Sequence, residues 1–442
     1  MARPRILRAD PHDREIVRLA VPAFGALAAE PLYVLADTAV VGRLGTDPLA
    51  GLAIAGIVLT AVFGIFNFLA YGTTAAVARR IGAGDRKRAA EQGVDGMWLG
   101  LFLGLGLTAA GLALAPWIVD VMGASSDVRP YALTYLRISL LGAPFMLVAL
   151  AGTGYLRGCQ DTATPLWIAV GANVANLVLE LVLVFRFDLG IAGSAWGTVV
   201  AQVGAATVYV AIVGRSVRAE HAAITPDRAG IRAAAVVGGH LVVRTGSLLL
   251  ALLVATAVAS RIGDDEVAAH QIAFQVWTFL AYALDAIAIA GQAIVGRVLG
   301  AGDARAARAA ARRMLEWGVV GGVAVGLLVA AGTSVLPMLF SRDEGVRGAA
   351  SEVLWVVAAL QPLNALVFVL DGILIGAGDS RYLAVAMAGA TLVYLPIAGL
   401  VVALDGGLLA LWGALAVFMV ARFVGMGGRF RTERWIITGA SR

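Results

Sequence analysis

The chain has 442 residues, of which 60% are hydrophobic and 14% are charged, and its mean hydropathy is +0.86. Soluble domains are about 45–50% apolar and about 25% charged, so this composition excludes an ordinary soluble protein. The single cysteine, Cys159, excludes an intramolecular disulfide, and the four histidines lack a metal-binding spacing. The net charge of +5 would suit nucleic acid, but the basic residues lie between apolar segments. Membrane orientation explains that placement better, so we expect no nucleic-acid partner.

Long apolar runs follow one another along the chain, and each has about 20 residues or more, enough to cross a hydrocarbon core of about 30 Å as a helix. They predict membrane spans at 16–42, 50–78, 94–119, 131–156, 164–186, 190–214, 237–261, 267–295, 315–340, 350–376, 382–403 and 407–428. The expected fold is therefore an all-α integral membrane protein with twelve transmembrane helices.

Arginine gathers in alternate breaks between these spans. One side holds the N-terminal segment and the breaks within 79–88, 215–232, 305–313 and 429–434, whereas the other side is short and mostly acidic. We therefore expect a protein of the plasma (inner) membrane, and the positive-inside rule places both of its termini in the cytoplasm. The first apolar run lacks a cleavage site, so we expect it to be retained.

The two halves of the chain repeat. The segment "TAVVGRLG" at 38–45 returns as "TAVASRIG" at 256–263, and "IGAGDRKRAA" at 81–90 returns as "LGAGDARAAR" at 299–308, both 218 residues further on. The repeat predicts an N-terminal six-helix lobe at 1–214, a cytoplasmic linker at 215–236 and a C-terminal six-helix lobe with a basic tail at 237–442. Six helices per repeat give two lobes of the same orientation, with a substrate cavity expected near the membrane midplane. Asp85 and Asp303, in the two GAGD copies, are predicted to cap helices.

Asp37 lies within the first span, far from either flank. A charged Asp at mid-membrane costs on the order of 2.5–3.5 kcal/mol on insertion scales, and such residues usually face the protein interior and function there. The matching position of the second half is Ala255. A carboxylate needed for packing should recur in the repeat, so Asp37 is predicted to bind the coupling proton or cation. The alternative is a neutral Asp that joins two helices.

A second polar set lies in the fifth and sixth spans. Asn176 and Glu180 are four residues apart and so share one helix face, which Asn173 extends, and Thr198 follows in the next span. The matching positions of the second half are Tyr394, Ala398 and Ala414. Together with Asp37, these oxygens suit a proton relay or a hard cation such as Na⁺. For Asn176 and Thr198, ordinary interhelical hydrogen bonding is an equally good interpretation.

Other intramembrane polar residues are candidates for cavity or structural roles. Glu30 precedes Asp37 by seven residues and therefore shares its helix face. Arg244 needs a partner, and Asp285 on the next span is the nearest candidate in sequence. A buried Arg–Asp pair is more often structural than catalytic.

At several segments the chain resembles the multidrug and toxic compound extrusion (MATE) family, and within it the DinF branch. The segments are "EPLYVLADTAVVGRLG" at 30–45, "ARRIGAGD" at 78–85, "YLRGCQDTATPL" at 155–166, "AAHQIAFQVW" at 268–277 and "VGRVLGAGD" at 295–303. They sample both halves, so the resemblance covers the whole spanning region. It implies two six-helix lobes that open alternately to each side. It also implies export of lipophilic, often cationic and aromatic compounds in exchange for inward H⁺ or Na⁺, without a cofactor.

The resemblance also implies roles for individual residues. Asp37 is in the place of the coupling carboxylate, and Pro22 is in the place of a proline that lets the first helix bend. Asn176, Glu180 and Thr198 match the polar set of the fifth and sixth helices, so Na⁺ could bind at these three residues and Asp37. The acid at Glu180 is Asp in some relatives, which leaves the ion preference open. The second-lobe acids of another branch are not clearly matched, and Asp285 and Asp371 are the candidates.

Rival interpretations come from other classes. A lipid-linked precursor flippase of the same superfamily would need several basic residues for pyrophosphate, whereas the predicted spans show chiefly Arg244. A membrane enzyme lacks a nucleophile–base or metal constellation, so we expect no enzymatic activity. An architectural scaffold would not need ionisable groups of this kind within its spans. A channel would be favoured if the protein equilibrates its substrate but cannot concentrate it against a gradient. The expected partners are small organic substrates and membrane lipids, and the expected functional unit is a monomer.

Overall fold

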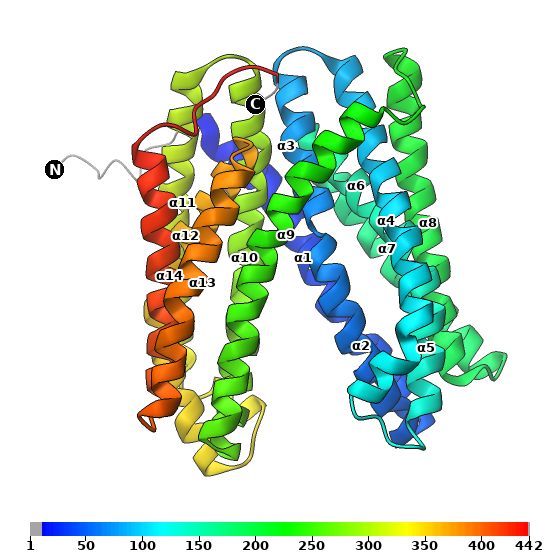
Figure 1. Ribbon diagram of the computed structural model, residues 1–442, viewed down its shortest axis with the longest axis vertical. Coiled ribbons are helices and arrows are strands. Elements are labelled where there is room, and N and C mark those ends of the chain that lie inside the picture. Colours follow the sequence, from blue (N-terminus) through cyan, green and yellow to red (C-terminus); the bar gives the residue numbers. More distant parts are fainter. Residues whose placement is uncertain (1–10, 441–442) are drawn as a thin grey trace. The chain divides into compact units, whose positions relative to one another are not determined.

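The computed structural model describes residues 11–440, and this part of the chain is built from helices (Figure 1). Arg3, Arg5 and Arg8, which entered the prediction of orientation, lie outside the described residues. Eleven helical segments are long and apolar enough to cross a membrane, and a twelfth span is formed by Arg129–Leu141 and Ala143–Gly158, which are bent by 48°. The prediction of an all-α protein with twelve spans is therefore confirmed.

The helices differ from the predicted spans mainly where a span is broken into two. The elements are α1 (Pro11–Val41), η2 (Gly42–Leu44), α2 (Thr46–Phe66), α3 (Phe68–Gly82), α4 (Arg86–Val121), α5 (Arg129–Leu141), α6 (Ala143–Gly158), α7 (Ala163–Leu181), η3 (Val182–Arg186), α8 (Gly190–Ala219), α9 (Arg228–Ile262), α10 (Asp264–Gly300), α11 (Ala304–Gly332), η4 (Leu336–Leu339), α12 (Glu344–Gly376), α13 (Ser380–Ala403) and α14 (Leu408–Arg431). The predicted span 50–78 becomes α2 and α3, which meet at Asn67, and the span 131–156 becomes α5 and α6, which meet at Gly142.

The chain divides into two compact units. The N-lobe is residues 25–238, and the C-lobe combines residues 11–24 with residues 239–440. Helix α1 therefore begins in the C-lobe and ends in the N-lobe. The segment 215–236, expected to be a linker, contains the end of α8 and the start of α9, which are joined by residues 220–227. Asp95 of α4 holds this connection inside the N-lobe, because it accepts a hydrogen bond from the backbone N–H of Asp227 at 3.0 Å.

The break between α5 and α6 has a chemical cause. Pro144 has no N–H, so the carbonyl of Leu140 lacks its usual helical partner. The hydroxyl of Thr108 on α4 donates to that carbonyl instead, at 2.7 Å. On the same helix α4, a Cβ at Gly104 would collide with the Cα of Pro144, so only glycine allows the two helices to approach this closely. The bend is thus fixed by three residues that lie on two helices.

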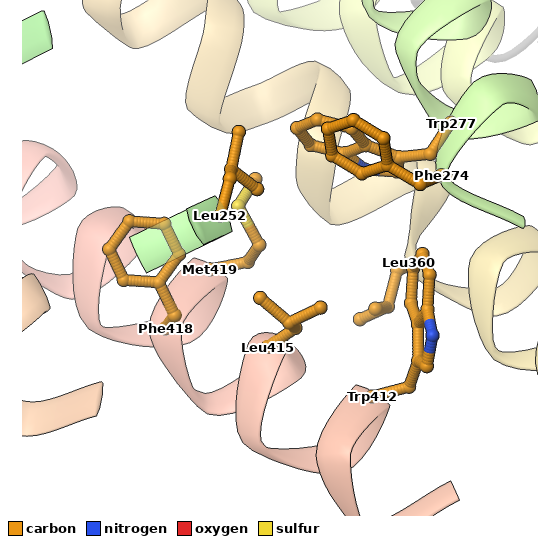
Figure 2. Close-up of a pocket in the computed structure, with 8 residues that line it drawn as sticks. All are labelled: Leu252, Phe274, Trp277, Leu360, Trp412, Leu415, Phe418 and Met419. Carbon is orange, nitrogen blue, oxygen red and sulfur yellow. The ribbon is translucent and has the colours of Figure 1, made fainter. Parts of the chain in front are cut away.

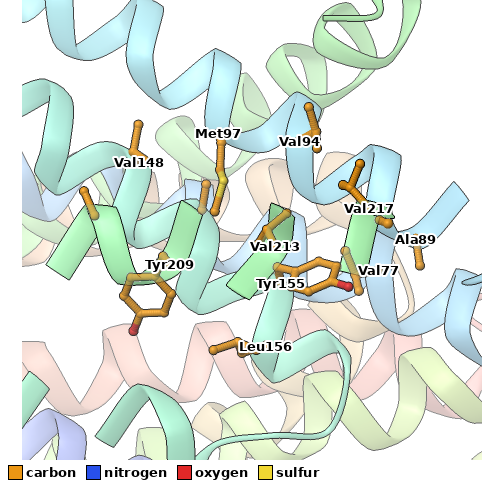
Figure 3. Close-up of a cluster of buried hydrophobic side chains, with 13 residues drawn as sticks. Val77, Ala89, Val94, Met97, Val148, Tyr155, Leu156, Tyr209, Val213 and Val217 are labelled. Carbon is orange, nitrogen blue, oxygen red and sulfur yellow. The ribbon is translucent and has the colours of Figure 1, made fainter. Parts of the chain in front are cut away.

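Two apolar clusters give the N-lobe its core. One joins α3, α4, α6 and α8 through side chains such as Val77, Met97, Tyr155 and Val213, which interdigitate between the helices (Figure 3). The other joins α1, α2, α4, α5 and α8, and it includes Val41, one turn after Asp37. The second cluster therefore fixes the end of α1 that carries the candidate coupling residue.

The repeated GAGD turns serve as helix caps, as predicted. Asp85 accepts from the backbone N–H of Arg88 at the start of α4. Asp303 accepts from two backbone N–H groups at the start of α11. The preceding glycines, Gly84 and Gly302, have φ of +77° and +82°, a conformation that L side chains rarely adopt. In the C-lobe, α12 is the central helix and packs on α10, α11 and α14.

Candidate functional site

Asp37 lies buried on α1, and two other helices of the N-lobe hold its carboxylate. The hydroxyl of Ser194 on α8 donates to Oδ1 at 2.5 Å, and the hydroxyl of Tyr135 on α5 donates to Oδ2 at 3.2 Å. Both donors are neutral, so they orient the carboxylate without cancelling its charge.

Glu180 brings a second carboxylate to the same place. Glu180 is fully buried on α7, and its carboxylate lies beside the carboxylate of Asp37 and the hydroxyl of Ser194. Within the described chain, neither Glu180 oxygen has a hydrogen-bond partner, and the Oδ1 of Asn176, one turn earlier, has none either. The hydroxyl of Ser194 donates to Asp37 and is therefore not available as a donor to Glu180. Three acceptor oxygens thus remain available beside Asp37.

Thr198 joins the polar residues of α7 and α8. Its hydroxyl accepts a hydrogen bond from Nδ2 of Asn176 at 3.2 Å and lies 2.8 Å from the hydroxyl of Tyr33 on α1. A Cβ at Gly197 would lie 3.1 Å from Oδ1 of Asn176, so a glycine lets α8 approach the polar face of α7. Just after Glu180, α7 widens into a π-helical turn at Val182–Arg186, a feature common at functional sites.

The charges of this cluster are not balanced by protein cations. Across residues 11–440, neither Asp37 nor Glu180 forms an ion pair with Arg, Lys or His. Two adjacent buried carboxylates repel each other, so a shared proton or a bound cation is needed to stabilise the pair. The described residues contain no group of three or more His, Cys, Asp or Glu that could hold a metal ion. Two carboxylates with amide and hydroxyl oxygens are suited instead to H⁺ or to a hard monovalent cation.

The other predicted residues of α1 and α7 do not contact the Asp37 carboxylate directly. Asn173 donates to the backbone carbonyl of Ala29 at 3.0 Å and so ties α7 to α1. Glu30 is exposed and does not enter the hydrogen-bonded cluster around Asp37. Pro22 lies inside α1, which continues through it. Because proline has no N–H and clashes with the preceding turn, this position weakens the helix locally.

In the C-lobe the main buried ion pair joins α9 to α12. Arg244 donates through Nε and Nη2 to the two carboxylate oxygens of Asp371, with an Nε–Oδ1 distance of 3.3 Å. Asp285, the nearest acid in sequence, lies partly exposed on α10. The carboxylate that accepts both hydrogen bonds therefore comes from a helix that is distant in the sequence.

The positions of the C-lobe that match the polar cluster are apolar or aromatic. They are Ala255, Tyr394, Ala398 and Ala414, and each is at most 2% exposed. The second lobe thus preserves the helices of the repeat while it lacks the carboxylates.

Three residues with roles in buried polar clusters were missed from the sequence. Tyr33 stands four residues before Asp37 on the same helix, a spacing that could have revealed it. Tyr135 comes from α5, and no sequence pattern connects that helix to α1. Arg422 lies in the predicted span 407–428 and is an intramembrane cation that the sequence plainly contains.

Comparisons with known proteins agree on one family. The family model MatE matches residues 22–182 and 246–400. Protein DETOXIFICATION 44, chloroplastic, of Arabidopsis thaliana is 33% identical over 436 residues, which cover 95% of this chain and 83% of that protein. DNA damage-inducible protein F of Escherichia coli K12 is 28% identical over 432 residues, which cover 95% of this chain and 92% of that protein.

Solved structures share the fold. A MOP superfamily transporter from Pyrococcus furiosus superimposes with a TM-score of 0.86 at 24% identity, and the match covers 97% of this chain and 98% of that one. A MATE crystal structure in the bent conformation gives a TM-score of 0.88 at 24% identity, with 97% of each chain covered.

Proposed function

The chain belongs to the multidrug and toxic compound extrusion (MATE) family of membrane transporters, and on that premise we propose that it is a secondary active antiporter. It would export lipophilic organic compounds, cationic ones among them, in exchange for H⁺ or Na⁺. The substrates are small molecules, as for the family, and the protein is a multi-pass membrane transporter rather than an enzyme. We further propose that it works as a monomer in the plasma (inner) membrane, with both termini in the cytoplasm.

The observation that carries this proposal is the pair of buried carboxyl groups, Asp37 and Glu180, in which both Glu180 oxygens lack a hydrogen-bond partner among residues 11–440. One bound proton or cation removes the repulsion between them. The site is therefore stable when it is loaded and strained when it is empty. That difference is what an antiporter needs, because an ion can shift a conformational equilibrium only through a different affinity for the two states.

Helix α1 offers a route from the ion to the substrate. It carries Asp37 in the N-lobe and Pro22 in the part that belongs to the C-lobe. Loading of Asp37 changes the hydrogen bonds that hold the end of α1 to α5 and α8, and Pro22, like Pro31 on the same helix, lacks an N–H and so favours a bend. We propose that this bend lowers the affinity for the exported compound and releases it.

The site accommodates either coupling ion. A proton needs only the two adjacent carboxyl groups. Na⁺ would be held by oxygens from Asp37, Glu180, Asn176 and Thr198, which are the hard ligands that such a cation prefers. The deciding experiment is transport by purified protein in sealed vesicles, with a pH gradient and a sodium gradient imposed separately. Accumulation of a fluorescent cationic dye in one condition identifies the ion, and failure in both would contradict antiport.

A lipid-linked precursor flippase remains the alternative within the superfamily. Binding of pyrophosphate would call for free basic groups in the substrate path. Arg244, the cation on which that alternative rested, is engaged with Asp371. This pairing removes Arg244 as support for the flippase, whereas Arg422 remains as a second buried arginine of the C-lobe.

A further inference from the structure

Two helices, α1 and α9, each belong to both lobes. Residues 11–24 of α1 lie in the C-lobe and the rest of the helix lies in the N-lobe, whereas α9 has residues 228–238 in the N-lobe and residues 239–262 in the C-lobe. These helices are the first spans of the two repeats. The shift of 218 residues carries the change of lobe in α9 to residues 20 and 21, close to the change in α1. Each helix therefore begins in one lobe and ends in the other.

The first turn of α1 is bound to α11 by a buried arginine. Arg313, whose side chain is 9% exposed, donates through Nε and Nη2 to the two carboxylate oxygens of Asp13, at 2.6 and 2.8 Å. The indole N–H of Trp317, one turn later on α11, donates to the same carboxylate at 2.8 Å. A second ion pair joins Glu15 of α1 to Arg297 of α10. A bidentate pair fixes orientation as well as distance, so the start of α1 is held firmly in the C-lobe.

The start of α9 is held in the N-lobe by α4. Asp95 is buried and accepts from the backbone N–H of Asp227 at 3.0 Å, and the indole N–H of Trp98 donates to the carbonyl of Ile224 at 3.0 Å. Asp227 in turn caps α9, because its carboxylate accepts from two backbone N–H groups of the first turn. A Cβ at Gly230 would collide with Oδ2 of Asp95, so glycine lets this turn approach the carboxylate closely.

The two anchors occupy equivalent positions of the repeat. Asp95 lies 218 residues before Arg313, the same shift that relates the GAGD turns at the starts of α4 and α11. Trp98 and Trp317, which complete the anchors, follow these positions by three and four residues. The same place on the matching helix thus holds a crossing helix in each lobe, with a carboxylate in one and a guanidinium in the other. The role recurs although the sign of the charge is reversed, which indicates that holding the crossing helix is what the position does.

Each crossing helix also has a weak point close to its change of lobe. In α1, Pro22 and Pro31 lie on either side of it and lack an N–H. In α9 the change falls between Gly238 and Gly239, and glycine weakens the interior of a helix. Beyond that point α9 packs in the C-lobe, where Leu252 faces the same small apolar cavity as side chains of α10, α12 and α14 (Figure 2). Both ends of each helix are therefore fixed, and the part that deforms most readily lies between them.

We propose that Arg313 and Asp95 are positioning residues that keep the starts of α1 and α9 attached to their lobes throughout the transport cycle, so that each helix deforms at its weak point instead of moving as a rigid rod. The effect on transport rests on the antiport function proposed above. With the anchor at Arg313, a change of hydrogen bonds at Asp37 bends α1. Without it, the same change displaces the start of the helix, so ion binding persists while uphill export is lost.

The first test measures the anchor itself and requires no transport. Spin labels replace Arg14 of α1 and Ala309 of α11, both exposed, in a Cys159→Ser background. Their distance distribution in purified protein should be narrow, and it should be the same in acidic and alkaline buffer and with or without sodium. A wild-type distance that changes with pH or with sodium would show that the start of α1 detaches, and it would overturn the proposal without the need for any further variant to fold.

Replacement of the anchor gives the complementary result. Arg313→Gln should broaden the distance distribution between the two labels. Arg308→Gln is the matched control, because Arg308 lies on the same helix but forms its ion pair with Glu433, and it should leave the distribution narrow. A distribution that stays narrow in Arg313→Gln would show that Arg313 does not hold the helix.

The second test is substrate accumulation in sealed vesicles under the ion gradient that drives the wild type. Arg313→Gln should lose accumulation, and Arg308→Gln should retain it. Asp13→Cys with Arg313→Cys should also lose it and should regain it when a bifunctional thiol reagent joins the two cysteines, because the covalent bridge replaces the ion pair. A bridge that blocks transport in a protein that is active without it would mean that the anchor has to open, which contradicts the proposal.

In the N-lobe, a conservative variant separates an anchor from a proton carrier. Asp95→Asn keeps an acceptor oxygen for the N–H of Asp227 and should retain accumulation, whereas Asp95→Leu lacks that acceptor and should lose it. Loss of accumulation in folded Asp95→Asn would assign an ionisable role to Asp95 and remove it as an anchor. Absence of accumulation in the wild type would contradict antiport instead, and the label distances would still decide whether α1 is anchored.

Discussion

Replacement of Asp37 by asparagine isolates the charge at the candidate coupling site, because the side chain keeps its size. The remaining oxygen can still accept from Ser194, which now lies at 2.5 Å, whereas the contact with the hydroxyl of Tyr135 at 3.2 Å is lost. The new amide can donate to Glu180, whose oxygens have no partner in residues 11–440. One neutral hydrogen bond is worth about 1 kcal/mol, so the gain and the loss roughly cancel. Asp37→Asn should therefore insert and fold with a stability within about 1–2 kcal/mol of the wild type.

The effect on transport should be much larger than the effect on stability. If one proton is exchanged for each substrate molecule, a gradient of one pH unit supplies about 1.4 kcal/mol, which sustains about a tenfold concentration ratio of an uncharged substrate. An asparagine at this position cannot take up the proton. The sustained ratio should fall from about tenfold to about one, although substrate could still move down its own gradient.

The measurement uses sealed vesicles that contain purified protein, with substrate accumulation followed after a pH jump. Thr38→Val is the matched control, because Thr38 is the next residue of α1, is exposed, and donates only to the backbone of its own helix. It should transport like the wild type. Normal uphill efflux by folded Asp37→Asn would refute the coupling role and would leave Glu180 as the next candidate.

Three further outcomes are expected. Glu180→Ala should reduce gradient-driven transport more than Asp285→Ala at equal protein levels, and equal losses would bring the C-lobe acid into the coupling mechanism. A cysteine placed at Thr225 in a Cys159→Ser background should be protected from an impermeant thiol reagent added outside intact cells, whereas labelling would reverse the proposed orientation. Asp371→Asn should lower the free energy of unfolding by about 3–5 kcal/mol, because it leaves a buried arginine without its carboxylate. Thermal unfolding in detergent measures that loss, and an unchanged midpoint would show the ion pair to be dispensable.

Much of the fold follows from the sequence because membrane helices satisfy their own backbone hydrogen bonds, and length and polarity are then enough to find them. The positions where a span is broken into two helices were harder to predict. The bend at Gly142 depends on a carbonyl freed by Pro144 and satisfied by Thr108 from another helix. The interruption at Asn67 lies inside a continuous apolar run. Such features depend on contacts between helices, and hydropathy along one helix does not report them.

The candidate site was predictable only in part. The spacing of Asn176 and Glu180 on one helix, and the absence of matching acids from the repeat, identified the polar face of α7. The structure adds the direct contact between Glu180 and Asp37, which lie 143 positions apart in the chain. Tyr135 could not be found, since the packing of α5 on α8 decides its position. The sequence likewise did not reveal that Arg244 forms an ion pair with Asp371, which is 127 residues away.

The asymmetry between the repeats leads to a last prediction. Ala255 occupies the place of Asp37 in the C-lobe and is 1% exposed. An aspartate there would lack the partner that Asp37 has in Glu180, because the matching position on α13 is Ala398. Ala255→Asp should lower stability by on the order of 2.5–3.5 kcal/mol, as for an uncompensated acid at mid-membrane, and Ala255→Asn should lower it less. Thermal unfolding of both variants measures the difference. If Ala255→Asp instead folds normally and restores proton-driven export to Asp37→Asn, then either lobe can hold the coupling carboxylate. That result would contradict the proposal that only the packing of the N-lobe supports coupling.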